Sequence, residues 1–339
     1  MHMNQMDLRG TARAGSRILM DTSVRDTVPL LSIAIPTYKR FDLLAETLES
    51  VFALHFDFSV EVLVVDNDPS NDALALQEIS RFRDHSFVYY KNIENVGMFG
   101  NWNQGINLAR GKYVTILHDD DLLLPAFAAE LNSRLLQPAA EPAPILAFQV
   151  AILDQRENRP QEIPKDRVVD AHALTAAPSK GAGKTRIKGT REFFFGNPFC
   201  GTLGVVMRRD LALSVGSFDP SWFPIADYEF WCRWVAAIGD IPIVSEKVGL
   251  YRMRQNESMV PQTRSAFVTK SRELRSRMIS EGVVPGFYSL LLSTSARVQK
   301  LAIDRDWLAD GERIKRSSAL AVFVWRCLVF SLTRLLPHR

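Results

Sequence analysis

Short apolar segments alternate with amphipathic segments along the N-terminal part of the chain. Apolar runs that end in proline or polar residues predict buried strands at 30–36, 60–65, 87–90 and 112–117. Between them, apolar residues at helical spacing predict helices at 41–52, 74–82 and 102–109. This alternation is typical of the α/β class, with a Rossmann-like, mostly parallel sheet covered by helices on both faces.

Polar clusters follow three of these predicted strands. They are Pro36-Thr37-Tyr38, Asp66-Asn67-Asp68 and Asp119-Asp120-Asp121. Ligands of open α/β sheets bind beyond the carboxyl ends of the strands. The sequence therefore predicts a binding site where these three clusters meet.

The remainder of the chain predicts further units with different patterns. Residues 154–190 are polar and rich in Pro, Gly and Lys, as expected of a long loop or lid, whereas 201–208 and 226–238 predict a strand and a helix. We expect four units: a flexible extension at 1–28, an α/β domain at 29–258, a helical extension at 259–312 and a basic terminal helix at 313–339. The first unit lacks the apolar run of a secretory signal.

Composition and charge exclude several classes of protein. The chain is 47% hydrophobic and 23% charged, as in ordinary globular proteins. Its 41 basic and 38 acidic residues give +3, but the segment 313–339 holds six basic residues and no acid, so the remainder carries −3. That body is not a nucleic-acid-binding polycation. The three cysteines show no CxxC spacing, which favours a reducing, cytoplasmic compartment over a disulfide framework.

The three adjacent aspartates at 119–121 suggest chemistry at the end of a strand. Neighbouring carboxylates repel one another, and a divalent cation that bridges them to a diphosphate removes this repulsion. Such a cation, Mg²⁺ or Mn²⁺, also stabilises the charge that develops on a leaving phosphate. The alternative is a solvated acidic turn or helix cap.

Taken together, four motifs resemble the inverting nucleotide-sugar glycosyltransferases of family 2, which have the GT-A fold. The motifs are LSIAIPTYKR, VEVLVVDNDPSND, NVGMFGNWNQGINLARGKY and ILHDDDLLLP, and the resemblance extends from Leu30 to Ser258. It implies a metal-dependent transfer from a nucleoside-diphosphate sugar, a UDP-sugar first of all, to a hydroxyl of a glycan or lipid-linked glycan in polysaccharide synthesis.

The resemblance also implies roles for individual residues. It places the donor nucleotide against Pro36, Thr37, Tyr38, Arg40, Asp66, Asp68, Asn95, Gly97, Asn103 and Asp119. It places the metal on Asp120, with Asp121 as a further candidate, because the motif aligns in two frames and one of them puts His118 at the first acidic position. For the two asparagines and the glycine, turn and capping chemistry is the alternative.

The chain departs from the common family pattern at two positions. Trp102 stands where an arginine often precedes the second asparagine, so a phosphate contact is lost or comes from elsewhere. Arg254 stands where histidine is usual. Arginine does not ligate a cation, but its fork suits pyrophosphate oxygens, and we expect Arg254 to contact the diphosphate. A plain surface arginine is the alternative.

The segment from Ile225 to Trp231 resembles the acceptor-side motif of the family. Inverting transfer requires a carboxylate that removes the proton of the acceptor hydroxyl. Asp227 matches the position of this catalytic base, and Glu229 is the second candidate, although residues two apart on a helix face different directions. The alternative for Asp227 is a favourable charge at a helix N-terminus.

The terminal segment is apolar between 319 and 336 but is interrupted by Arg326 and Arg334. A spanning helix needs about 20 apolar residues, and a central arginine is costly. We expect a basic helix on the anionic inner face of a membrane. The alternatives are packing on the protein's own core and a homodimer interface.

Two other classes of function stay open at this point. A nucleotidyltransferase also uses acidic metal ligands, but it normally has a glycine-rich loop after the first strand, and PTYKRFD has no glycine. An inactive glycan-binding or scaffold protein of the same fold would not need both Asp120 and Asp227.

Overall fold

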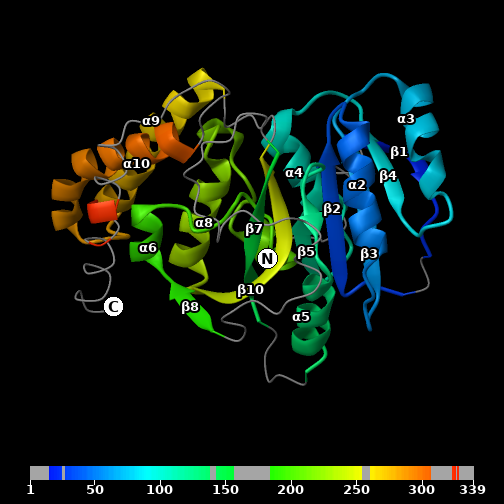
Figure 1. The fold of residues 1–339 in the computed structure, drawn as a ribbon, viewed down its shortest axis with the longest axis horizontal. Coiled ribbons are helices and arrows are strands. Elements are labelled where there is room, and N and C mark those ends of the chain that lie inside the picture. The colour runs from blue at the N-terminus through cyan, green and yellow to red at the C-terminus, as the bar shows by residue number, and fades with distance from the viewer. Residues whose placement is uncertain are drawn as a thin grey trace, which may run out of the picture.

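The computed structural model describes residues 15–24, 27–137, 143–155, 184–253, 260–306, 323–325 and 327. In these ranges the chain forms a ten-stranded mixed sheet with helices on both faces, which confirms the predicted α/β class (Figure 1). The strand order is β1-β4-β3-β2-β5-β9-β7-β10-β6, and β8 pairs with β10. The strands are β1 (Ser16–Asp21), β2 (Leu31–Thr37), β3 (Val60–Asp66), β4 (Val88–Asn92), β5 (Tyr113–Ile116), β6 (Leu122–Leu123), β7 (Ile145–Asp154), β8 (Thr185–Lys188), β9 (Val205–Arg208) and β10 (Ile241–Met253).

The helices connect these strands and extend beyond the last one. The α-helices are α2 (Phe41–Phe52), α3 (Asp72–Ile79), α4 (Gly97–Leu108), α5 (Pro125–Leu135), α6 (Thr190–Phe195), α7 (Arg209–Ser214), α8 (Ala226–Ala237), α9 (Pro261–Ser280) and α10 (Leu292–Asp306). Short 3-10 helices are η1 (Ser80–Phe82), η2 (Pro220–Trp222) and η4 (Gly286–Leu291). The helices α9 and α10 lie at one end of the molecule beside α6 and α8, and α3 lies at the other end (Figure 1).

The N-terminal half of the sheet follows the predicted pattern closely. The strands β4, β3, β2 and β5 are parallel, and α2 has the predicted bounds. In β2 every residue is buried, because helices cover both faces of the sheet. Thr37 pairs with Asp66, so the ends of β2 and β3 lie side by side.

The predicted flexible extension at 1–28 requires a correction. Residues Ser16–Asp21 form β1, which pairs antiparallel with β4 at the edge of the sheet. The side chains of Leu19 and Met20 pack against the hydrophobic core. A run of only three apolar residues is too short to predict a strand, but an existing sheet edge provides its hydrogen-bond partners.

The sequence analysis predicted a strand at 201–208, which contains β9, but it did not predict that the sheet is antiparallel around this strand. This strand pairs antiparallel with both β5 and β7, and β7 runs parallel to β10. The predicted loop at 154–190 is shorter than expected at its C-terminal end, because β8 pairs with β10 and α6 begins at Thr190. Most of that loop, residues 156–183, lies outside the described ranges.

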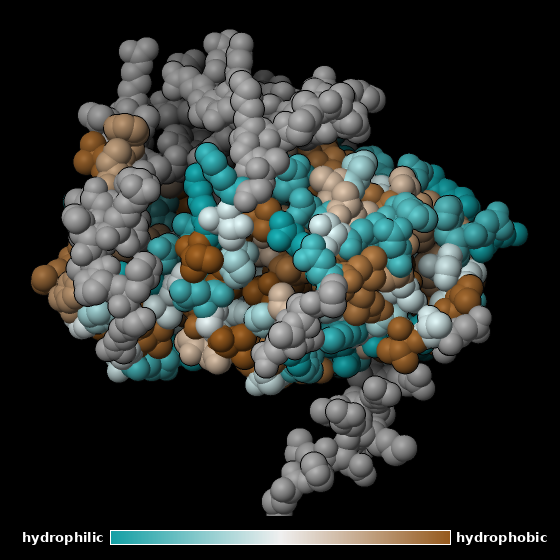
Figure 2. Space-filling model, turned by 90° about the horizontal axis from the view of Figure 1, so that it is seen from below, coloured by the Kyte–Doolittle hydropathy of each residue, from teal (hydrophilic) through white to brown (hydrophobic). Residues whose placement is uncertain are grey.

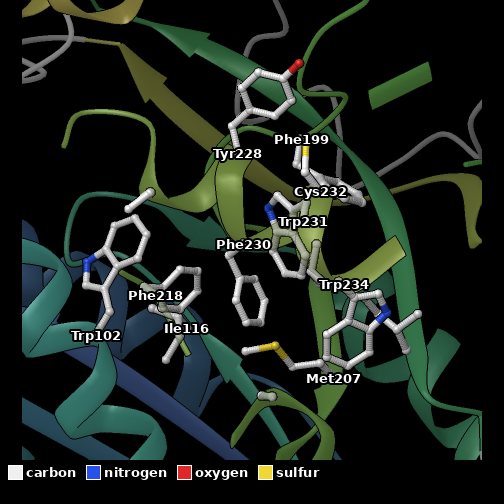
Figure 3. Packing of buried hydrophobic residues seen from close by; sticks show 14 of the residues in the cluster. Trp102, Ile116, Phe199, Met207, Phe218, Tyr228, Phe230, Trp231, Cys232 and Trp234 are labelled. Atoms are coloured by element: carbon white, nitrogen blue, oxygen red, sulfur yellow. The ribbon is translucent and has the colours of Figure 1, made fainter. Parts of the chain in front are cut away.

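Two hydrophobic cores cover the two faces of the sheet. One contains apolar residues of α2, α3 and α5, and the other contains residues of α4, α6 and α8. Figure 3 shows the second core, in which the ring of Phe218 lies 5.2 Å from Trp102 and 4.5 Å from Phe230 between ring centroids. Phe230, Trp231 and Trp234 are fully buried here. Their rings therefore stabilise the packing of α8 on the sheet.

The helical extension predicted from residue 259 onward is present as α9, η4 and α10. Tyr288 of η4 packs on Phe194 of α6 with ring centroids 4.8 Å apart. Of the terminal segment, only 323–325 and 327 are described, and the ring of Trp325 lies 6.2 Å from that of Phe195. Among the described residues, no helix combines the length and hydropathy needed to cross a membrane.

The described surface mixes polar and apolar side chains. On the face seen in Figure 2, hydrophobic residues are scattered between hydrophilic ones rather than gathered in one band. Single exposed apolar side chains are normal for globular proteins and need no special explanation.

Candidate active site

The ends of β2, β3 and β5 converge, as predicted from the three polar clusters. The backbone N–H of Asn67 donates to the carbonyl of Thr37 over 2.9 Å. The hydroxyl of Thr37 donates to Oδ2 of Asp119 over 2.7 Å. The end of β2 therefore contacts both the end of β3 and the acidic loop that follows β5.

Asp119 and Asp120 share one cationic partner. The guanidinium of Arg40 donates one N–H to Oδ1 of Asp119 and another to Oδ2 of Asp120, the latter over 2.8 Å. Burial raises the pKa of Asp119 to about 6, although Arg40 opposes this shift. The side chain of Asp119 is 1% exposed and that of Asp120 is 14% exposed, so Asp120 is the more accessible of the two.

Asp121 is fully buried and only half satisfied. Its Oδ1 accepts the backbone N–H of Arg252 over 3.0 Å, whereas its Oδ2 accepts no hydrogen bond from the described residues. That Oδ2 lies 3.3 Å from Nδ1 of His118. Burial raises the pKa of Asp121, and the nearby Asp120 carboxylate adds to the rise. The nearby His118 opposes this rise, because a buried carboxylate is costly unless a positive charge or a proton reaches it.

These residues fit a divalent cation. Ligand atoms of His118, Asp120 and Asp121 all lie within 4.8 Å of one another. Two carboxylates match hard cations such as Mg²⁺ and Mn²⁺, and an imidazole adds a nitrogen ligand that transition metals accept. The buried position of Asp121, whose Oδ2 belongs to this group together with His118, favours a cation over a solvated acidic turn.

His118 is held rigidly from several sides. Its ring stacks on Trp102 with centroids 4.7 Å apart, and its Nε2 lies 3.2 Å from the hydroxyl of Thr202. A Cβ on Gly201, whose φ is +63°, would come within 2.8 Å of the imidazole, so glycine leaves the room for this ring. Burial opposes the charged imidazole, but Asp121 and then Asp120 outweigh it and raise the pKa of His118.

Arg252 fixes the backbone of the acidic loop. Its guanidinium, in a side chain only 3% exposed, donates to the carbonyl of Asp120 over 2.8 Å, to Glu46 over 2.6 Å and to Gln155 over 3.0 Å. The sequence analysis missed this residue, because nothing local links it to a loop more than a hundred residues earlier. Arg254, which was expected at the diphosphate, lies outside the described ranges.

The second strand end holds two carboxylates in different surroundings. Asp66 is buried and accepts bonds of 3.0 Å from both the ammonium of Lys91 and the hydroxyl of Tyr89. Burial would raise the pKa of Asp68, but hydrogen bonds from Ser70 and Asn71 outweigh it and lower that pKa. The carboxylate of Asp66 therefore binds side chains of β4 within the sheet. The lowered pKa of Asp68 favours its ionised form in the loop after β3.

A network of asparagine side chains connects the strand ends to α4. Asn67 donates to Asn95 over 2.9 Å and accepts from Asn92 over 3.0 Å. Asn101 donates to the carbonyl of Val65 over 2.9 Å. The sequence analysis singled out Asn95 and named Asn67 as part of a polar cluster, but it missed Asn92 and Asn101, since their partners are far apart along the chain.

Two further positions with expected donor contacts are engaged in local structure. The amide of Asn103 donates to the carbonyl of Phe218 over 2.7 Å and accepts its N–H over 2.9 Å. Gly97 begins α4 with a φ of +73°, which favours glycine. At the end of β2, Pro36 is buried and Tyr38 is 43% exposed, so the ring of Tyr38 is accessible to a ligand.

Asp227 lies in the first turn of α8. Its Oδ2 accepts a hydrogen bond of 2.9 Å from Asn197. Burial raises the pKa of Asp227 to about 6, while the backbone N–H of Tyr228 and the charge of His118 oppose the rise. His118 thus interacts electrostatically with Asp227 as well as with Asp121.

Glu229 has a different environment from Asp227. Its carboxylate, 1% exposed, accepts bonds of 2.8 and 2.9 Å from Nε of Arg233, and Arg277 lies 3.4 Å away. Arg233 also donates to the carbonyl of Ser217 over 2.6 Å. Glu229 therefore connects α8 to the loop after α7 and to α9.

The described residues thus form an α/β domain with acidic side chains at the ends of its strands. The sequence model described as "Glycosyl transferase family 2" matches residues 32–213, which is more than half of the chain. The chain belongs to glycosyl transferase family 2.

Known proteins with related sequences include named and unnamed glycosyltransferases. An uncharacterized glycosyltransferase of Methanocaldococcus jannaschii is 23% identical over 236 residues, 68% of this chain and 73% of that protein. The GalNAc(5)-diNAcBac-PP-undecaprenol beta-1,3-glucosyltransferase of Campylobacter jejuni is 33% identical over 108 residues, 32% of this chain and 35% of that protein. An uncharacterized Mycobacterium tuberculosis protein is 26% identical over 217 residues, 62% of this chain and 63% of that protein.

Solved structures show the same fold. S. aureus TarS superimposes with a TM-score of 0.54 at 15% identity, covering 81% of this chain and 44% of that chain. Residues 1–349 of TarS superimpose with a TM-score of 0.52 at 14% identity, covering 86% of this chain and 77% of that chain. These likenesses support the predicted GT-A fold.

Proposed function

We propose that this protein is an inverting, metal-dependent glycosyltransferase that uses a nucleoside-diphosphate sugar. The observation that carries the proposal is the presence of two acidic centres near His118. One is the loop of Asp119, Asp120 and Asp121, and the other is the half-buried Asp227, whose pKa is raised to about 6. Donor activation and acceptor deprotonation need two such centres with different environments.

The donor nucleotide binds at the ends of β2 and β3 in this proposal. The exposed ring of Tyr38 and the ionised Asp68 face the base and ribose, and Asp119 lies at the ribose or at the metal. His118, Asp120 and Asp121 hold Mg²⁺ or Mn²⁺. When bound, the cation supplies charge stabilisation for the leaving diphosphate.

Asp227 acts as the catalytic base. A carboxylate with a pKa of about 6 is ionised at neutral pH, yet it accepts a proton more readily than an ordinary aspartate. The acceptor oxygen attacks the anomeric carbon from the face opposite the leaving diphosphate, and its proton passes to Oδ of Asp227. Asn197 orients that carboxylate through its hydrogen bond of 2.9 Å. Glu229, held by Arg233, is a structural residue.

The acceptor is a glycan or a lipid-linked glycan at the cytoplasmic face of a membrane. The Campylobacter jejuni relative is named for an undecaprenol-linked acceptor, which supports this class of substrate. The absence of CxxC spacing among the three cysteines of the sequence agrees with a reducing compartment.

A screen of nucleotide sugars tests the proposed activity. A matching donor with Mn²⁺ should raise the melting temperature by several degrees, since a ligand at a hundred times its Kd stabilises the folded state by about 2.7 kcal/mol. Either ligand alone should have a smaller effect. NMR of the product should show the anomeric configuration opposite to that of the donor. Retention of configuration, or transfer of a nucleotidyl group, would contradict the assignment.

The terminal segment predicts binding to an anionic membrane. The six basic residues between Arg313 and Arg339 contribute about 1 kcal/mol each at such a surface. Exposed apolar side chains of η4 and the described part of the segment, Phe287, Leu290, Phe323 and Val324, add contacts that salt does not screen. The full chain should sediment with anionic vesicles and be only partly released by salt.

A chain truncated after Glu312 is the matched comparison, and neutral vesicles are the control for charge. The truncated protein should stay in the supernatant and melt at nearly the same temperature as the full chain. A truncated protein with a much lower melting temperature, together with a full chain that does not sediment with vesicles, would show that the segment packs on the protein instead.

A further inference from the structure

Arg40 occupies the position where the proposed metal needs a free carboxylate. Its guanidinium bridges Asp119 and Asp120 and so neutralises much of the acidic loop. Oδ2 of Asp120, which accepts the bond of 2.8 Å from Arg40, belongs to the same carboxylate that joins His118 and Asp121 in the candidate metal group. Two cations therefore compete for Asp120.

The backbone around Arg40 is fixed, whereas its side chain is accessible. Arg40 caps the N-terminus of α2, and the preceding Lys39 has a φ of +58°, which sets the direction of the turn after β2. The Arg40 side chain is 42% exposed. Arg252, the other arginine that contacts the acidic loop, is 3% exposed and holds three partners. Of these two arginines, Arg40 is the one that can change partners without disturbing the core.

A diphosphate at this site requires positive charge from the protein as well as from the metal. Trp102 provides none, because its indole is buried and stacked on His118. Lys91 is also buried and is paired with Asp66. A guanidinium at the end of β2 is well suited to the task, since its fork binds phosphate oxygens through two N–H groups as readily as it binds carboxylates.

We propose that Arg40 exchanges Asp119 and Asp120 for the donor diphosphate when the metal binds. In the free protein it acts as a built-in counter-ion that weakens metal binding, and in the donor complex it contacts the phosphates. This inference rests on the proposed function. Its consequence is positive coupling: the nucleotide draws Arg40 away from Asp120, so nucleotide and metal strengthen each other's binding.

Metal binding without nucleotide is the direct test. Mn²⁺ titrated into the free protein and followed by electron paramagnetic resonance should bind about tenfold more tightly to Arg40→Met than to the original chain, a change within the usual range of coupling between sites. The enhancement of Mn²⁺ affinity by UDP should shrink by a similar factor in the same variant. Arg40→Lys keeps the charge but cannot bridge both carboxylates, and should fall between the two.

Arg81→Met is the matched control for the loss of one positive charge. Arg81 is 55% exposed and lies 3.7 Å from Glu49 on the surface, away from the acidic loop. The Arg81→Met variant should bind Mn²⁺ and UDP with the affinities of the original chain. The melting temperatures of all variants report whether they fold.

Two outcomes separate the exchange from the function on which it rests. If the original chain binds Mn²⁺ and UDP cooperatively but Arg40→Met and Arg40→Lys leave its Mn²⁺ affinity unchanged, the exchange is wrong and the proposed function stands. If the original chain binds no nucleotide with any divalent cation, both are wrong.

Discussion

Asp227→Asn is expected to lower kcat by about 10²–10⁴ while donor affinity stays unchanged, because the amide cannot accept the proton of the acceptor hydroxyl. The substitution is nearly isosteric. The new side-chain oxygen can still accept the hydrogen bond that Asn197 donates to Oδ2 of Asp227. Steady-state kinetics with a water-soluble acceptor, together with calorimetry of UDP in the presence of Mn²⁺, measure the two quantities separately.

Glu229→Gln provides the comparison on the same helix. Its carboxylate binds Arg233 and lies near Arg277, so its loss should cost about 1–3 kcal/mol of stability and leave the chemical step nearly intact. Thermal unfolding and kcat distinguish the two effects. A stable but inactive Glu229→Gln beside an active Asp227→Asn would exchange the roles of the two residues.

The role of Asp227 as the base also predicts how kcat/KM depends on pH on the acidic side of the profile. Because burial raises the pKa of Asp227 to about 6, the active carboxylate form is lost as the pH falls through that value. The ratio kcat/KM should therefore decrease tenfold per pH unit well below 6 and level off above it. Asp119 also has a pKa of about 6, so the profile of Asp227→Asn separates the two groups. The residual kcat/KM of Asp227→Asn should no longer show the decrease at low pH that protonation of Asp227 causes in the original chain.

The local sequence pattern predicts the parallel half of the fold and the place of the site. Continuous apolar runs in β2 and β3 show strands that are buried on both faces, and polar residues at their ends mark the ligand edge. The antiparallel half around β9 is harder to predict. That strand has four residues, and its pairing with β5 and β7 is set by packing rather than by a local pattern.

Long-range contacts explain which parts of the site the sequence leaves open. An asparagine on a helix such as α4 can serve equally well in a ligand contact or in a hydrogen bond to the backbone, and only the position of Phe218 shows how Asn103 is used. The same holds for Glu229, whose role depends on Arg277 of α9. For Arg252 the sequence suggested no role at the site. Its hydrogen bond to the carbonyl of Asp120 in the acidic loop shows that this strand residue supports the site.

These contacts divide the acidic loop into an anchored and an accessible part. Asp121 is fixed by the backbone N–H of Arg252, and the carbonyl of Asp120 is fixed by the guanidinium of the same residue. The carboxylate of Asp120 takes no part in this anchoring, because its partner in the described structure is the half-exposed Arg40. The loop can therefore lose that carboxylate and keep its backbone.

Asp120→Ala should abolish transfer, by at least about 10³-fold, and should remove the Mn²⁺ dependence of UDP binding. The melting temperature should change little, because the bonds from Arg252 to the loop backbone remain. Asp121→Asn is the comparison, since its fully buried carboxylate also anchors the loop, and its replacement should lower the melting temperature in addition to weakening metal binding. Calorimetry of UDP with and without Mn²⁺ measures the central quantity. An Asp120→Ala protein whose Mn²⁺-dependent affinity for UDP equals that of the original chain would show that the cation binds elsewhere.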